Sequence, residues 1–200
     1  MLTASASTFC SPSQLVDAGF VEMSSSGFYS TRLSNLQRLS SVIDGGSTTV
    51  TVPNVPTIRL RLSGVTALAQ LDTGFDDAVV RNSININAAF LNALLNGAPG
   101  TLVRESGLDL TLTTCAGVSE PVTAWRVAAG RQLEFVSPDG GVARVAPSAV
   151  LFAKDTPPAA RVCGGIGTWS VNAAQVAGSF FVDAEAVVFD PVRSAVWMPR

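Results

Sequence analysis

The chain has 200 residues, of which 47% are apolar and 14% charged, so it can bury a core and is neither a disordered chain nor a highly charged helical rod. Thirteen basic residues against 15 acidic ones give a net charge of −2, which argues against a nucleic-acid partner. Histidine is absent. This excludes Ser-His-Asp and Cys-His catalysis and histidine-bound zinc, and leaves carboxylates, hydroxyls, thiols, arginine and the single lysine, Lys154.

The N-terminal part of the chain, residues 1–46, is rich in Ser and Thr and weakly periodic, and it ends in an Asp-Gly-Gly linker signal. We expect it to form a flexible or loosely attached segment, followed by one lobe over residues 47–200. Residues 1–12 have neither the basic region nor the apolar region of a signal peptide. No apolar run is long enough to cross a bilayer, so no membrane span is predicted.

Short β-branched or alternating segments, separated by Gly, Pro and Asp, predict a mainly-β fold. Residues 58–62 and 65–71 are expected to form a hairpin around a Ser-Gly turn. One helix is predicted over residues 84–95, with Asn82 or Ser83 as its N-cap. The other predicted strands are residues 48–52, 108–113, 122–127, 132–136, 142–145, 150–153, 186–189 and 195–198.

The most informative motif is Asp72-Thr73-Gly74, which directly follows the predicted strand 65–71. A strand end holds the carboxylate rigidly, the glycine permits unusual backbone angles and close approach of a substrate, and the threonine hydroxyl can hold the loop. Taken alone, Asp-Thr-Gly is more often an ordinary turn than a catalytic loop. The residues around it therefore decide its interpretation.

Those residues resemble the catalytic-loop region of retropepsin-type aspartic proteases. These enzymes also run a β-hairpin into apolar-Asp-Thr-Gly, followed by a small residue, two aspartates and an apolar pair, and here Asp76-Asp77 and Val79-Val80 follow. Further segments resemble the C-terminal lobe of pepsin-like proteases, in consistent order over residues 57–199. They are Val145-Ala146-Pro147-Ser148-Ala149, Val176-Ala177-Gly178, Val187-Val188-Phe189-Asp190 and Val196.

The resemblance implies a mainly-β single-lobe acid-protease fold, pepsin/retropepsin-like, with one clear helix. It implies that Asp72 is the catalytic carboxylate and that Thr73 and Gly74 support the catalytic loop. Gly74, Asp76 and Asp77 match substrate-contacting positions, although the two aspartates are equally explained as an exposed, solvated acidic pair.

The same resemblance places the apolar-apolar-Gly element, Val176-Ala177-Gly178, beside the catalytic loop, so we expect it to pack under Asp72. A buried strand that needs Gly for close backbone contact would have the same sequence.

Three cysteines, Cys10, Cys115 and Cys163, permit one disulfide and one leftover thiol. The resemblance implies that Cys115 and Cys163 form the disulfide of the lobe, with two buried free thiols as the alternative, and it gives Cys10 no counterpart. A structural disulfide predicts an oxidising location, secreted or periplasmic.

Aspartic protease chemistry needs two carboxylates that share one proton: one activates a water, and the other polarises the scissile carbonyl of a peptide or protein substrate. The chain has one Asp-Thr-Gly. We therefore expect a homodimer in which Asp72 of each chain meets at a two-fold axis, without metal or cofactor. A separate partner lobe or a longer two-lobed chain would also complete the site.

Two departures from the family favour other interpretations. Pepsin-like enzymes place Ser or Thr after the glycine, where this chain has Phe75, and no arginine follows Gly178 to pair with Asp76 as in retropepsins. A pepsin-lobe module without catalysis, used for binding or inhibition, and an unrelated β-domain with a chance Asp-Thr-Gly therefore remain alternatives.

Overall fold

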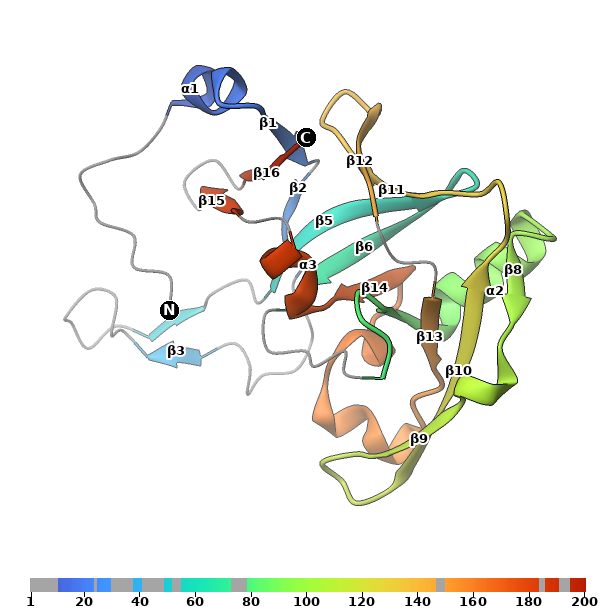
Figure 1. Ribbon diagram of the computed structural model, residues 1–200. Coiled ribbons are helices and arrows are strands. Elements are labelled where there is room, and N and C mark those ends of the chain that lie inside the picture. Colours follow the sequence, from blue (N-terminus) through green and yellow to red (C-terminus); the bar gives the residue numbers. More distant parts are fainter. Residues whose placement is uncertain are drawn as a thin grey trace.

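A computed structural model describes residues 11–23, 25–29, 38–40, 49–51, 55–72, 79–146, 150–183, 186–190 and 195–200. Within these residues the fold is mainly β, with one long helix and several short helical turns (Figure 1), which confirms the predicted fold class at this level. No helix in these ranges combines the length and the apolar character that crossing a membrane requires.

Helices and 3-10 turns occur between the strands along the chain. The helices are α1 (Pro12–Asp17), α2 (Ala88–Gly97) and α3 (Gly178–Asp183), and the 3-10 turns are η2 (Ser106–Leu108), η3 (Pro158–Cys163) and η4 (Ile166–Thr168). The strands are β1 (Phe20–Met23), β2 (Ser25–Tyr29), β3 (Arg38–Ser40), β4 (Thr49–Thr51), β5 (Val55–Leu62), β6 (Val65–Leu71), β7 (Ile84–Asn87), β8 (Leu102–Arg104), β9 (Leu110–Thr113), β10 (Ser119–Val127), β11 (Leu133–Val136), β12 (Val142–Val145), β13 (Val150–Lys154), β14 (Ala173–Val176), β15 (Val188–Asp190) and β16 (Ala195–Pro199).

Most strands belong to one large sheet with the order β12-β11-β5-β6-β14-β7-β13-β10-β8, to which β2 and β9 also pair. Its centre is built from strands that are distant in sequence. Strand β14 is parallel to β6 and antiparallel to β7, and so lies between two strands that are consecutive in the chain. This insertion places β14 next to the end of β6.

The hairpin predicted around the Ser-Gly turn is confirmed. Strands β5 and β6 pair antiparallel with Leu62 opposite Val65. The two turn residues, Ser63 and Gly64, have φ values of 48° and 83°. Two-residue turns with positive φ match the twist of hairpin strands, which explains the glycine.

The main hydrophobic core forms around these central strands, because alternate residues of β5, β6 and β7 point inward. Ile58, Leu60 and Leu62 of β5 are fully buried. Helix α3 joins this core through Phe180, whose ring meets the ring of Phe135 edge-on at 6.1 Å between centroids. The core thus connects the sheet to the helix that directly follows β14.

The start of the predicted helix over residues 84–95 is wrong. Its first four residues form strand β7, and the helix begins at Ala88 and ends at Gly97. The sequence Ile84-Asn85-Ile86-Asn87 alternates with period 2, and β7 pairs with β13 on one side and β14 on the other. The N-cap is Asn87, whose side chain accepts the N–H of Phe90 at 3.0 Å.

Asn87 also joins α2 to the segment before β14. It is 2% exposed, its Oδ1 accepts the N–H of Ala173 at 3.0 Å, and its Nδ2 donates to the carbonyl of Val171 at 2.8 Å. One buried side chain thus satisfies backbone groups of two elements 86 residues apart in sequence.

Replacing Asn87 by Ala is expected to lower the free energy of unfolding by about 2 kcal/mol, because the helix loses its cap and buried N–H groups lose their acceptor. Urea-induced unfolding measures this change. Asn92→Ala, on the exposed face of the same helix, is the matched control and should change stability by less than about 0.5 kcal/mol. Equal effects of the two substitutions would contradict the assigned role of Asn87.

Strand pairing crosses the predicted boundary between residues 46 and 47. Strand β1 pairs antiparallel with β16, and β2 pairs antiparallel with β5. Helix α1 packs Leu15 against Ala195 and Trp197 of β16. These parts of the N-terminal segment are therefore built into the sheets of the lobe.

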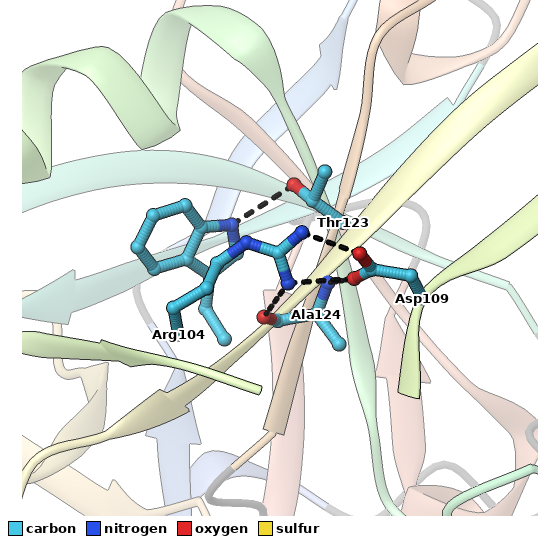
Figure 2. Close-up of polar contacts among 5 residues, drawn as sticks. Arg104, Asp109, Thr123 and Ala124 are labelled. Carbon is cyan, nitrogen blue, oxygen red and sulfur yellow. Dashed lines mark hydrogen bonds and ion pairs between the residues drawn. The ribbon is translucent and has the colours of Figure 1, made fainter. Parts of the chain in front are cut away.

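At one edge of the large sheet, an Arg–Trp–Asp cluster attaches strand β8 to β10 (Figure 2). The guanidinium of Arg104 lies over the ring of Trp125, 5.3 Å from its centroid, and its Nη1 donates to Asp109 Oδ1 at 2.6 Å. The same oxygen accepts the N–H of Ala124 at 2.9 Å. These hydrogen bonds lower the pKa of Asp109 below its ordinary value, and the bond from Arg104 has the largest effect.

This shift predicts how stability depends on pH. Because the pKa of Asp109 is lower in the folded chain, its contribution to stability is present above the unfolded pKa of about 3.9 and is lost as the pH falls through the folded pKa. The stability of Asp109→Asn should therefore fall less than that of the wild type on acidification below about pH 4. Thermal melts at a series of acidic pH values test this, and parallel curves for the two proteins would contradict it.

Candidate active site

The structure places Asp72 directly after β6, where the pairing of this strand with β14 continues by one residue. The N–H of Asp72 donates to the carbonyl of Val176 at 3.1 Å, and Leu71 lies opposite Val176 in the parallel register. Val176 and Ala177 are fully buried, and Gly178 begins α3. The predicted apolar-apolar-Gly element and the predicted catalytic aspartate therefore lie side by side.

The carboxylate of Asp72 is held by a line of side-chain amides across three strands. Gln175 on β14 donates from Nε2 to Asp72 Oδ2 at 2.6 Å, and its Oε1 accepts from Asn85 Nδ2 on β7 at 3.0 Å. Gln175 and Asn85 are direct partners in the register of β14 and β7. Because Asn85 occupies Oε1, the NH₂ group of Gln175 faces the carboxylate and fixes its orientation.

Sequence reasoning did not find Gln175 or Asn85. The signal that would have found them is a polar residue inside an otherwise buried strand. Asn85 is 8% exposed between the fully buried Ile84 and Ile86, and a buried amide requires hydrogen-bond partners.

The chain that follows residues 73–78 is attached to α3. Arg81 forms an ion pair with Asp183, and Asn82 Nδ2 donates to the other carboxylate oxygen at 2.6 Å. The backbone N–H of Asn82 donates to Ser179 Oγ at 3.2 Å. The hydrogen bonds from Arg81 and then Asn82 lower the pKa of Asp183. Segments on both sides of residues 73–78 are thus fixed, one to β14 and the other to α3.

Several predicted site residues lie outside the described ranges. They are Thr73, Gly74, Phe75, Asp76, Asp77 and Cys10.

Three other aspartates among the described residues have their carboxylates engaged elsewhere. Asp109 is bound to Arg104, Asp139 accepts from Ser137 and the N–H of Gly141, and Asp183 binds Arg81. These three aspartates are therefore committed to other contacts and are poor candidates for a second carboxylate beside Asp72. Among the residues that the structure describes, no three His, Cys, Asp or Glu side chains lie close enough together to hold a metal ion.

The chain was also compared with known proteins. No protein-family model, no curated protein and no solved structure matches it. The case for a function therefore depends on Asp72 and the contacts around it.

The predicted disulfide is confirmed: Cys115 and Cys163 are bonded, with their Cα atoms 5.7 Å apart. It connects the turn after β9 to the end of η3, across 48 residues of sequence. The alternative of two buried free thiols is thereby excluded.

Proposed function

We propose that this chain is one lobe of an aspartic endopeptidase, with a pepsin/retropepsin-like fold, whose active site is completed by Asp72 of a second copy. The observation that carries the proposal is the position of Val176-Ala177-Gly178 beside Asp72, with β14 inserted between β6 and β7. The resemblance to retropepsins and pepsins implies this neighbourhood, although the two elements are about a hundred residues apart in sequence.

The chemistry assigned to the dimer uses two Asp72 carboxylates that share one proton. The ionised one takes a proton from the bound water, and the protonated one polarises the carbonyl of the scissile peptide bond. Pepsin-like enzymes support this carboxylate with a hydroxyl after the glycine, where this chain has Phe75. The amide of Gln175, 2.6 Å from Asp72 Oδ2, supplies a hydrogen bond to the same carboxylate.

The ion pair between Arg81 and Asp183 gives additional support. In retropepsins an arginine after the apolar-apolar-Gly element pairs with the first aspartate after the Asp-Thr-Gly. Here the arginine follows the loop and the aspartate lies on α3, so an ion pair connects the equivalent segments with the charges exchanged.

A second copy is the source of the other carboxylate that fits best. The chain has a single Asp-Thr-Gly, and Asp109, Asp139 and Asp183 are engaged in other contacts. A two-fold axis beside Asp72 supplies the partner without any new sequence element.

A second candidate function is a non-catalytic lobe that binds or inhibits another protein. The hydrogen bond from Gln175 favours it, because one oxygen of Asp72 is already held within the chain. In either case the disulfide supports an oxidising compartment, so we propose a secreted or periplasmic location.

Titration with a statine-type transition-state analogue, combined with peptide cleavage at acidic pH, tests the proposal. We expect acid-optimal cleavage, inhibition by the analogue, and one inhibitor bound per two chains, because the two copies share one site. Binding of one inhibitor per chain by a monomer would contradict the homodimer. Absence of both cleavage and inhibitor binding would contradict the protease and favour the binding lobe.

A further inference from the structure

A cavity of about 240 Å³ lies between β9, the end of β13 and the turns η3 and η4, and Asp72 is not among the residues that line it. The disulfide between Cys115 and Cys163 forms part of its wall. Its volume is smaller than the roughly 300–1,000 Å³ of pockets that hold drug-sized ligands. The cavity therefore has room for one side chain or a small molecule.

Two opposite charges line this cavity. The side chain of Glu120 on β10 is 6% exposed. Its Oε1 accepts a hydrogen bond from the hydroxyl of Thr156. The Nζ of Lys154, at the end of β13, lies 3.5 Å from Glu120 Oε2, which is longer than a hydrogen bond. No hydrogen bond of this ammonium is found among the residues that the structure describes. Both groups therefore have unused hydrogen-bonding capacity.

The position of Thr156 depends on a glycine. A Cβ atom at Gly167 would lie 1.8 Å from Thr156 Oγ1, closer than atoms can approach. Gly167 is not in the left-handed conformation that by itself favours glycine. Its lack of a side chain is therefore explained by the space that the Thr156 hydroxyl needs in order to reach Glu120.

We propose that this cavity binds a neutral primary carboxamide, the side chain of an Asn or Gln residue of a peptide or protein ligand. The carbonyl of the amide accepts from Lys154 Nζ, and its NH₂ group donates to Glu120 Oε2. An anion bound at Lys154 would also face the carboxylate of Glu120, and a cation bound at Glu120 would face the ammonium. A neutral group with adjacent donor and acceptor avoids both repulsions.

The test uses the fact that Lys154 is the single lysine of the chain. Labelling the lysine Cε with ¹³C gives one side-chain NMR signal that reports directly on the cavity. We expect a saturable shift of this signal on titration with N-acetylglutamine methylamide. The corresponding glutamate, lysine and methionine derivatives, which are similar in size, should bind at least about tenfold more weakly, because each lacks the neutral donor–acceptor pair.

Variants that remove one of the two charges should change which of the four probes binds most tightly. Glu120→Gln keeps the volume but leaves Lys154 as the single charge, so the glutamate probe should become the tightest ligand. Lys154→Met leaves Glu120 alone and should favour the lysine probe, measured by ligand-observed NMR. Glu134→Gln is the matched control. It removes the same charge from an ion pair with Arg61 outside the cavity, and should keep the wild-type ranking.

Three results would overturn the proposal: no response of the Lys154 signal to the glutamine probe, equal binding of all four probes, or tightest binding of a charged probe by the wild-type chain. Circular dichroism checks that the variants are folded. If Glu120→Gln does not fold, the ranking of the four probes by the wild-type protein still decides the question. The proposal does not depend on the protease proposal, because Asp72 takes no part in it.

Discussion

Replacing Asp72 by Asn is expected to lower kcat for peptide cleavage by at least about 10³-fold, because the substitution removes the ionisable group from both halves of the proposed site. Asn keeps the size of the side chain and can still bond to Gln175 through its oxygen, so the fold should be retained. A fluorogenic peptide assay at acidic pH measures the loss. Asp155→Asn, at an exposed aspartate outside the site, is the matched control and should keep full activity.

Mixing the two proteins tests the homodimer separately. If chains exchange between dimers, an equal amount of Asp72→Asn should lower the activity per wild-type chain to about half, because wild-type chains are drawn into mixed dimers with one carboxylate. Mixing with Asp155→Asn should cause no such loss. If chains exchange and activity still stays full in excess Asp72→Asn, each chain acts alone. Undiminished cleavage by Asp72→Asn itself would remove the aspartate mechanism.

Removing the disulfide is expected to have the largest effect on stability. The double variant Cys115→Ser, Cys163→Ser opens a link across 48 residues, which should lower the free energy of unfolding by about 4 kcal/mol through the entropy gained by the unfolded chain. Urea unfolding with and without a reductant measures the change. The reductant should destabilise the wild type and leave the double variant unchanged, and equal midpoints of the two oxidised proteins would contradict the prediction.

Loss of the disulfide should also affect the candidate site. Turns η3 and η4 lead directly into β14, and Ile166 and Trp169 pack with Ala173 at the start of that strand. Loss of the disulfide frees η3 from the turn after β9. We therefore expect catalysis by the double variant to be lost at a lower temperature than catalysis by the wild type.

Local features of the sequence were sufficient for several elements. The strand bounds of β6 and β12 were predicted as the structure has them, because each begins directly after a turn with Gly and contains β-branched side chains. The start of α2 was missed because Ile84 and Ile86 fit both a strand and one face of a helix. The pairing of β7 with β13 and β14 decides between them, and those partners are distant in sequence.

Of the candidate site, too, one part could be predicted from the sequence and another part could not. Asp72 was found because its neighbours form a recognisable motif. Gln175 and Asn85 lie on strands 90 residues apart, and although a polar residue in a buried strand marks each position, nothing local shows that the two amides meet at Asp72. The cavity beside Glu120 also combines residues of β10, β13 and η4 that no short window of sequence contains.

By itself, the sequence determined that this is a chain of short strands, and that without histidine any catalysis would have to use other groups, of which the acid at the end of β6 is the clearest candidate. Side-chain alternation, turn residues and composition act locally, so they can be read from neighbouring residues. Only the tertiary structure decided that β14 lies between β6 and β7, which side chain holds Asp72, and where opposite charges meet at a cavity. These depend on burial shared among distant segments, because a strand takes the partners that together exclude most water from its side chains.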